Sequence, residues 1–342
     1  MTWPNWDRAI TDHIEELMKL DENFDWKFSV ALVCLGKQGD RFSTYREDVS
    51  LEEKFELASR IEGLQGVGAY YPGELGDIDR YNELCSKYGF ETSEIVVDVF
   101  SDPRFMNGSL TNRSPEVRKL AVDRVKESMD AAVEIGCEMV NPWPGQDGFD
   151  YAFQADYRKS WGNMIAGFRE CAEYRSDVKV ALEYKLREPR SHIFLDTVGK
   201  TLHVCNEIGL DNVGVTLDIG HAMLASENIA ESAYLLGEAG KLFNIHLNDN
   251  YGDWDWDLIP GTTHLWQMLE FLLWLKLVEY RGWMLMDVSP NRDEPVQVFD
   301  QSIRSVNLAW SSLLKVGLEE ILERLEEGDI AKTWKVLGGA LS

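Results

Sequence analysis

The stretch that decides the fold joins two motifs, TLDIGHA at residues 216–222 and IHLNDNYGDWDWDL at residues 245–258. Each motif opens on a short apolar run of the kind that forms a buried strand, and the runs lead to Asp218 and His246. A helix is predicted between the motifs, over residues 229–239, and another ahead of them, over about residues 192–208. This alternation of strand and helix is typical of an α/β fold with parallel strands.

The same pattern recurs on both sides of this stretch. Glu183 ends the apolar run of VALEYK (180–185), and Asp287 ends that of MLMDVSP (284–290). Eight strands are predicted in all, within residues 27–36, 63–73, 93–100, 137–143, 178–185, 213–220, 241–249 and 282–289. Eight parallel strands with right-handed helical crossovers close into a (β/α)8 TIM barrel, whose strands bring their carboxyl ends to one mouth. We therefore expect an α/β barrel with Glu183, Asp218, His246 and Asp287 at its mouth.

Two helical segments are predicted outside the eightfold pattern. Residues 5–20 form a short amphipathic helix ahead of the first strand, and the Glu-rich residues 317–342 form a C-terminal helical tail. The barrel is accordingly assigned to residues 1–316. The tail could pack on the barrel or on another subunit, and this is compatible with a homodimer or a homotetramer.

The overall charge and the cysteines exclude several classes of protein. Acidic residues outnumber basic ones by 59 to 34, so the net charge of −25 disfavours nucleic acid and anionic membranes as partners. No apolar run approaches the ~18 residues that a membrane-spanning helix requires. The five cysteines are scattered, as expected for reduced thiols in the cytoplasm, and the N-terminus lacks a basic, apolar signal.

The side chains at the predicted mouth are potential metal ligands. His221 follows Asp218 by three residues, and Asp255 and Asp257 alternate with Trp256, so an extended backbone would point both carboxylates the same way. Imidazole and carboxylate groups bind Mg²⁺, Mn²⁺, Co²⁺ or Zn²⁺, and no cysteine stands among them. The residues therefore predict a metal centre rich in oxygen ligands.

Charge decides how many ions this centre needs. Five carboxylates belong to it: Glu183, Asp218, Asp255, Asp257 and Asp287. One divalent ion would leave a charge of about −3 in a partly closed cleft, where neighbouring like charges are unfavourable, whereas two ions would leave about −1. We therefore expect two divalent ions, either Mg²⁺, Mn²⁺ or Co²⁺.

Lys185 is the predicted cation of the site. It follows Glu183 by two residues, so the two side chains share one face of the fifth strand. A lysine in this position can hold a substrate oxygen and stabilise negative charge on it. The alternative is a structural ion pair between Lys185 and Glu183.

Several motifs occur in order along the chain: FSDPRFMNG at 100–108, VNPWPGQDG at 140–148, ExKxxEPR at 183–190, DxxH at 218–221, HxN and DxDL between 246 and 258, and DxxPxR at 287–292. Together they resemble the xylose isomerase family of TIM barrels over roughly residues 65 to 292. Asp218 and His246 are similar to the metal-site residues of the L-rhamnose isomerases. Xylose isomerases have Glu and Asp at those positions.

The resemblance implies two metal sites that share a carboxylate. The first ion would be bound by Glu183, Asp218, His246 and Asp287. The second ion would be bound by Asp218 as a bridge and by His221, Asp255 and Asp257. Lys185, Asp255 and His221 are the catalytic residues that the resemblance implies.

The resemblance also implies the residues that contact the substrate. Lys185 would bind the O1 oxygen of a small-molecule sugar, and Trp143 and Phe100 would form apolar walls of the cleft. Tyr70 stands where xylose isomerases have a histidine that assists opening of the sugar ring.

The implied activity is a divalent-metal-dependent interconversion of an aldose and a ketose, in which hydrogen moves between two carbons as a hydride. The alternative is a single-metal epimerase or lyase that acts on keto-sugars by proton abstraction, as C-glycoside deglycosidase-type barrels do. A barrel that binds sugar without turning it over is a third class. The added pair Asp255 and Asp257 favours the isomerase.

Overall fold

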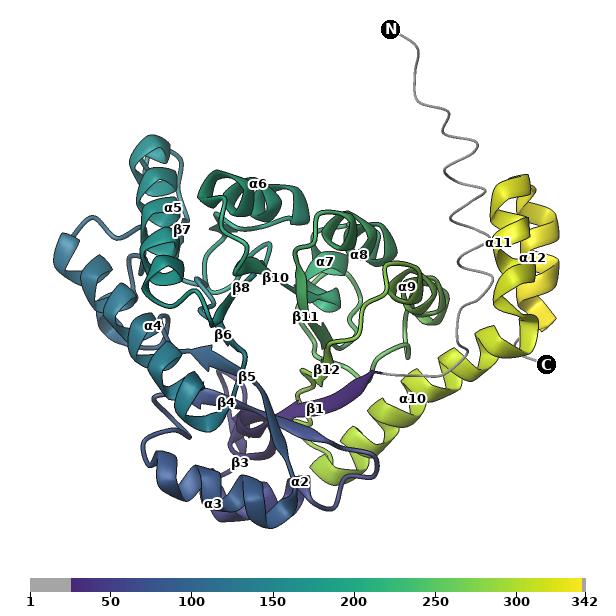
Figure 1. Ribbon diagram of the computed structural model, residues 1–342, viewed down its shortest axis with the longest axis horizontal. Coiled ribbons are helices and arrows are strands. Elements are labelled where there is room, and N and C mark those ends of the chain that lie inside the picture. The colour runs from purple at the N-terminus through teal and green to yellow at the C-terminus, as the bar shows by residue number, and fades with distance from the viewer. Residues whose placement is uncertain (1–25, 340–342) are drawn as a thin grey trace, which may run out of the picture.

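A computed structural model describes residues 26–339, and these form a closed parallel barrel (Figure 1). Its eight strands, in their order around the barrel, are β1 (Lys27–Ala31), β12 (Trp283–Met286), β11 (Leu242–Leu247), β10 (Val213–Asp218), β8 (Lys179–Glu183), β6 (Met139–Asn141), β5 (Glu91–Val97) and β4 (Gly66–Tyr71). The predicted (β/α)8 barrel and all eight of its strands are thus confirmed. The predicted helix over residues 5–20 lies outside the described residues.

Helices surround the barrel in chain order (Figure 1). The larger ones are α2 (Leu51–Ala58), α3 (Ile78–Tyr88), α4 (Pro115–Ile135), α5 (Tyr157–Tyr174), α6 (Val198–Ile208), α8 (Ile229–Glu238), α9 (Leu265–Leu277) and α10 (Pro295–Val316). Single helical turns form η1 (Leu32–Leu35) and η2 (Pro103–Phe105), and α7 (Ile219–Leu224) follows β10 directly.

Local sequence signals set the helix ends. Ser50 accepts a hydrogen bond from the backbone N–H of Glu53, whose side chain accepts one from the N–H of Ser50, so α2 begins with the capping box that its sequence predicts. The Ser114 side chain accepts from the N–H of Val117 at the start of α4, ahead of a proline at the first helical position, and Gly136 ends that helix in the left-handed region with φ 71°. Such a serine cap typically stabilises a helix by about 1 kcal/mol.

The strands are buried on both faces. In β10, Val213, Val215 and Leu217 are fully buried between the barrel and its helices. Near the mouth the buried side chains become polar, and they include Glu94, Asn141, Thr216 and Asn244. The register pairs Thr216 of β10 with Glu183 of β8, and Asp218 of β10 with His246 of β11. Closure of the barrel therefore brings candidate ligands from neighbouring strands together.

The loops contain elements that the sequence pattern did not predict. Two small antiparallel pairs form in the loops, β2 (Gln38–Gly39) with β3 (Thr44–Arg46) and β7 (Gly148–Phe149) with β9 (His192–Ile193). The helix predicted from residue 192 was therefore wrong at its start, because His192 and Ile193 pair with β7 and Thr197 caps α6.

The chain continues beyond α10 into two further helices, α11 (Leu318–Glu327) and α12 (Ile330–Gly338) (Figure 1). Trp334 of α12 packs edge-on against Trp266 of α9, with ring centroids 4.7 Å apart, so the described part of the tail contacts the barrel. The division of the chain into a barrel unit and a tail unit stays a prediction. Across residues 26–339, the helices are too short or too polar to cross a bilayer.

Candidate active site

Four potential metal ligands meet at the carboxyl ends of adjacent strands. Glu183, Asp218, His246 and Asp287 offer ligand atoms that all lie within 4.8 Å of one another. The first three side chains are buried, and that of Asp287 is 31% exposed. Three carboxylates at this spacing repel one another unless a cation lies between them.

His246 shows most directly that the group suits a cation. Its Nδ1 atom lies 3.6 Å from Glu183 Oε2, 3.7 Å from Asp287 Oδ2 and 3.9 Å from Asp218 Oδ2, too far for hydrogen bonds. This buried nitrogen has no hydrogen-bond partner among the described residues. An unsatisfied imidazole nitrogen that faces three carboxylate oxygens is the arrangement that a divalent ion would complete.

Glu94 on β5 fixes the orientation of His246. Its fully buried carboxylate lies 2.8 Å from His246 Nε2 and accepts a hydrogen bond from the side-chain amide of Asn244 at 2.9 Å. Since the carboxylate accepts the Nε2 proton, the lone pair of a neutral imidazole is on Nδ1, which faces the other ligands. Sequence analysis missed Glu94; its signal was an acid within the otherwise apolar run EIVV (94–97).

Amide donors orient the other buried carboxylates. Asn141 donates to Glu183 Oε2 at 2.7 Å, and Asn248 donates to Asp218 Oδ2 at 2.9 Å. The backbone N–H of His221, in the first turn of α7, donates to Asp218 Oδ1 at 2.8 Å. Neutral donors therefore hold both carboxylates in place without balancing their charge.

The second predicted group also lies at this mouth. His221 Nε2 is 3.3 Å from Asp255 Oδ2, and its Nδ1 is 3.2 Å from Glu183 Oε1, although not in hydrogen-bonding geometry. Lys185 Nζ contacts the same Asp255 oxygen at 2.6 Å and Glu188 at 2.9 Å. Lys185 thus pairs with Asp255 and Glu188, whereas the predicted alternative was an ion pair with Glu183.

Asp257 is held in place by both its backbone and its side chain. The hydroxyl group of Ser289 donates to Asp257 Oδ2 at 2.9 Å, and the N–H of Ser289 donates to the carbonyl oxygen of Asp257 at 3.0 Å. With φ 48° the residue has the left-handed conformation, which Asp tolerates better than most residues. This turn directs the carboxylate into the cavity that Asp255 and Asp287 also line.

The loop that carries Asp255 and Asp257 is closed at its base by Asp249. The backbones of Asp249 and Leu258 exchange hydrogen bonds at 3.0 and 2.9 Å. The buried Asp249 carboxylate accepts from the N–H groups of Thr263 and His264 and lies 2.8 Å from His264 Nδ1. These contacts fix both ends of the segment between residues 249 and 264.

Crowding of acids shifts the pKa values of the site. Burial raises the pKa of Asp287 to about 7; attraction by His246 opposes this shift, and repulsion by Asp218 and Glu183 adds to it. Burial and the charges of Asp255 and Asp287 raise the pKa of Asp257 well above its usual range. Burial disfavours the ammonium group of Lys185, but Asp255 and Glu188 outweigh this effect and raise its pKa. Lys185 is therefore charged at neutral pH.

A cavity of about 300 Å³ opens onto both groups. Lys185, Tyr70 and Trp143 line it together with the candidate ligands, and Lys185 Nζ lies 5.4 Å from the centre of the Trp143 ring. Phe100 does not line this cavity. It packs edge-on against Trp143 and Tyr70, with centroid distances of 4.9 and 6.5 Å, and its role as a wall of the cleft stays a prediction.

The barrel and its acidic, imidazole-bearing mouth define the class of protein. The chain belongs to the xylose isomerase-like TIM barrel family, whose model matches residues 55–308.

Two relatives are the xylose isomerases of Thermus thermophilus and Thermus caldophilus. They are 30% identical to this chain over 194 and 214 residues, which are 55% and 60% of its length. The chain spans about half of each relative, 50% and 54%.

Solved structures resemble the fold over most of the chain. A D-tagatose 3-epimerase-like protein has a TM-score of 0.63 and 23% identity, with 87% of this chain and 99% of that chain covered. A 3-keto-D-glucoside 4-epimerase from E. coli, in its apo form, has a TM-score of 0.64 and 15% identity, with 82% and 99% covered. At these identities the likeness concerns the fold alone.

Proposed function

We propose that this protein is a divalent-metal-dependent sugar isomerase that interconverts an aldose and a ketose. The observation that carries the proposal is that both groups of candidate ligands open onto one cavity, with the Lys185 ammonium group beside them. The family to which the chain belongs and its xylose isomerase relatives support the same conclusion.

In this proposal Glu183, Asp218, His246 and Asp287 hold the first ion. Asp218, His221, Asp255 and Asp257 hold the second. Bound ions of this kind supply Lewis acidity at the sugar's carbonyl and hydroxyl oxygens. The surplus of buried carboxylates over cations at the mouth supports the count of two, because one divalent ion would leave several negative charges unbalanced.

Lys185 binds the substrate oxygen on which negative charge develops. Its Nζ lies between Asp255 and the face of Trp143, so the ammonium group is fixed in orientation and largely shielded from water. A fixed cation in such a place stabilises developing charge more than a mobile one, because little reorganisation is required. Asp255 therefore acts both as a ligand and as the group that positions Lys185.

Tyr70 and Trp143 form the walls against which the sugar binds. Phe100 packs edge-on against both rings, so each aromatic face keeps its angle to the cavity. Burial and the nearby charge of Asp287 raise the pKa of Tyr70 well above its usual range, and its hydroxyl group remains a neutral donor at neutral pH. Tyr70 can thus donate to a sugar oxygen at the position where xylose isomerases have a histidine.

A single-metal epimerase or lyase is the second candidate, and one observation favours it. Among the described residues, the four ligands proposed for the first ion have ligand atoms that all lie close to one another, and the four proposed for the second ion do not form such a group. In the second group Asp255 contacts Lys185 and Asp257 accepts from Ser289. If these contacts persist with substrate, one ion is bound, and a carboxylate that is not a ligand can remove a proton from carbon.

The deciding experiment combines metal counting with isotope exchange. The purified enzyme is titrated with Mn²⁺, screened against free aldoses and ketoses, and run with the best substrate in D₂O. The isomerase proposal expects two ions per chain and almost no deuterium on carbon in the product, because transferred hydrogen does not meet water. One ion together with extensive carbon-bound deuterium would replace it with the epimerase or lyase class.

A further inference from the structure

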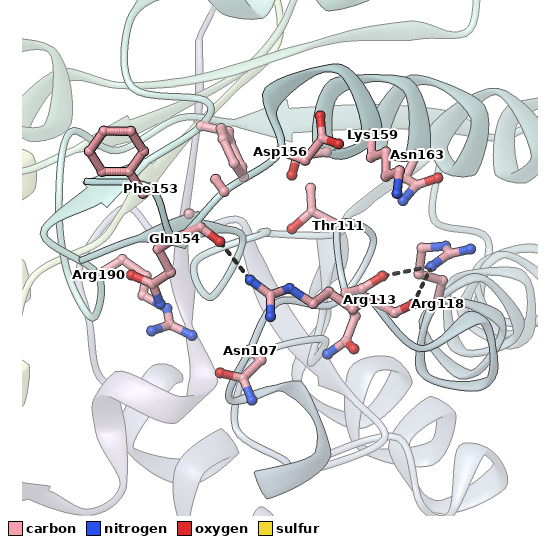
Figure 2. A pocket seen from close by; sticks show the side chains of 15 residues that line it. Asn107, Thr111, Arg113, Arg118, Phe153, Gln154, Asp156, Lys159, Asn163 and Arg190 are labelled. Carbon is pink, nitrogen blue, oxygen red and sulfur yellow. Dashed lines mark hydrogen bonds between the residues drawn. The ribbon is translucent and has the colours of Figure 1, made fainter. Parts of the chain in front are cut away.

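A second cavity, of about 810 Å³, lies beside the barrel mouth between the starts of α4 and α5 (Figure 2). It is lined by the segment from Asn107 to Arg118, by the segment from Phe153 to Asn163, and by Arg190 and Phe194. None of the residues that line it also lines the cavity of the candidate active site. Its chemistry is therefore independent of the proposed isomerase site.

Basic side chains gather in this cavity although the chain as a whole is strongly acidic. Arg113, Arg118, Lys159 and Arg190 line it, and Asp156 is the acid among the lining residues. The net charge of −25 makes such a local excess of cations unusual for this surface. Arg190 is neutralised by Asp150, whose carboxylate lies 2.6 Å from its guanidinium group, so Arg190 braces the wall.

The other cations are held without being neutralised. Arg113 donates to the carbonyl oxygen of Gln154 at 2.7 Å, and Arg118 donates to the carbonyl oxygen of Asn112 at 2.6 Å (Figure 2). Within residues 26–339, no carboxylate forms an ion pair with Arg113, Arg118 or Lys159. Backbone carbonyls orient the two guanidinium groups and leave their charge and several N–H donors available.

The two helix starts make this arrangement less favourable without a ligand. Arg118 lies in the first turn of α4, which also holds Glu116, and Arg158 and Lys159 follow the N-cap residue Asp156 in the first turn of α5. Cations are disfavoured at helix N-termini because the backbone N–H groups already carry partial positive charge. An anion in the cavity would relieve this repulsion and accept hydrogen bonds from the cations.

The balance of charge indicates what kind of anion fits. Once Arg190 and Asp150 are paired, three lining cations face the single acid Asp156, which also pairs with Arg158 at 3.6 Å, so at least two positive charges remain for a ligand. A phosphate monoester, which carries nearly two negative charges at neutral pH, matches this balance better than a monocarboxylate. Phe153, whose side chain is fully exposed, and Phe194 also line the cavity and could contact an apolar part of such a ligand.

We propose that the cavity between the starts of α4 and α5 binds the phosphate group of a small phosphorylated molecule, through Arg113, Arg118 and Lys159. The proposal goes beyond the isomerase function and does not rest on it.

The test uses two neighbouring residues as a matched pair. Lys159→Gln removes a cation that lines the cavity. Arg158→Gln removes the preceding cation of the same helical turn, which does not line the cavity and forms an exposed ion pair with Asp156 at 3.6 Å. Both side chains are exposed, so both variants are expected to fold, and circular dichroism checks this. Binding of inorganic phosphate and of phenyl phosphate is measured by calorimetry at constant ionic strength, with acetate as the singly charged control.

The proposal expects saturable binding of one phosphate per chain, tighter binding of phenyl phosphate, and weaker binding of acetate. Lys159→Gln should weaken phosphate binding roughly tenfold, as loss of one charge-assisted hydrogen bond does, and Arg113→Gln should act similarly. Arg158→Gln should change it less than about twofold. The affinity for Mn²⁺ should not change in any of these variants.

Three outcomes would overturn the proposal. Equal losses of phosphate affinity in Lys159→Gln and Arg158→Gln would show that the overall positive charge at the start of α5, and not a defined binding site, attracts phosphate. Phosphate binding that is unaffected by Lys159→Gln and Arg113→Gln would place the anion elsewhere, for example at the metal centre. Self-association that Lys159→Gln abolishes, without saturable phosphate binding, would show that the cavity receives an acidic segment of a second copy.

Discussion

Replacing Glu94 gives the sharpest test of how the barrel prepares His246 to bind a metal. Glu94→Leu has a similar size and removes the acceptor that lies 2.8 Å from His246 Nε2. The imidazole then loses the partner that keeps its lone pair on Nδ1. Loss of such a partner behind a metal-binding histidine typically lowers metal affinity 10–100-fold, which corresponds to about 1.4–2.8 kcal/mol.

Glu94→Gln separates the charge of Glu94 from its hydrogen bond. A glutamine oxygen can still accept from His246, and its NH₂ group would face the amides of Asn244 and Asn141. Both asparagines have an unpartnered side-chain oxygen, so they can rotate to accept from it. Glu94→Gln should therefore lower the metal affinity about tenfold, and Glu94→Leu should lower it about 100-fold.

The assay is calorimetric titration of metal-free protein with Mn²⁺, with a thermal melt to confirm folding. Glu227→Gln is the matched control, because Glu227 also accepts two hydrogen bonds, from the Tyr184 hydroxyl group and the Val198 N–H, but does not line the cavity. Its Mn²⁺ affinity should equal that of the native protein. A folded Glu94→Leu protein that binds Mn²⁺ as tightly as the native one would refute this account of His246.

Three further predictions address the ions, the lysine and the pH dependence. The double variant Asp255→Asn, Asp257→Asn should bind one Mn²⁺ per chain instead of two, as measured by metal analysis after dialysis; two retained ions would contradict the ligand assignment. Lys185→Met should lower turnover of the best sugar about 10²–10³-fold while Mn²⁺ affinity changes little, because Lys185 is not a ligand, and full activity would show that its ion pairs are structural. A metal must displace the proton of Asp287, whose pKa is raised to about 7, and those of His246 and His221, whose pKa values the neighbouring carboxylates raise against burial, so Mn²⁺ affinity should fall at least about tenfold per unit as the pH drops below about 7. Calorimetry in buffers of different ionisation enthalpy should detect the released proton, and an affinity that is constant from pH 5 to 8 would contradict the raised pKa.

The barrel could be predicted from sequence because its signals are local. Apolar runs marked each strand, and signals such as Ser50, Ser114 and Gly136 marked the helix ends. The start of α6 was wrong because the pairing of β7 with β9 depends on two loops that are distant in sequence. Local periodicity contains no information about such a pairing.

The convergence of the candidate metal ligands was predictable for a related reason. Ligands at the ends of successive strands converge in any barrel, so Glu183, Asp218 and His246 follow from the topology. Glu94 did not follow, because its role depends on β5 and β11, which are not neighbours in the barrel, placing Glu94 and His246 at the same depth inside it. The position of Phe100 against Trp143 likewise depends on side-chain packing, which motif spacing does not specify.

The two groups of ligands differ in what they are attached to, and this gives them different mechanical stiffness. Glu183, Asp218 and His246 cannot shift relative to one another without breaking hydrogen bonds of the sheet. Asp255 and Asp257 belong to a loop that is clamped at its base by Asp249 and lies outside the sheet between residues 250 and 257. A rigid first centre beside a more compliant second one would allow one half of the site to follow a changing substrate while the other half keeps its geometry.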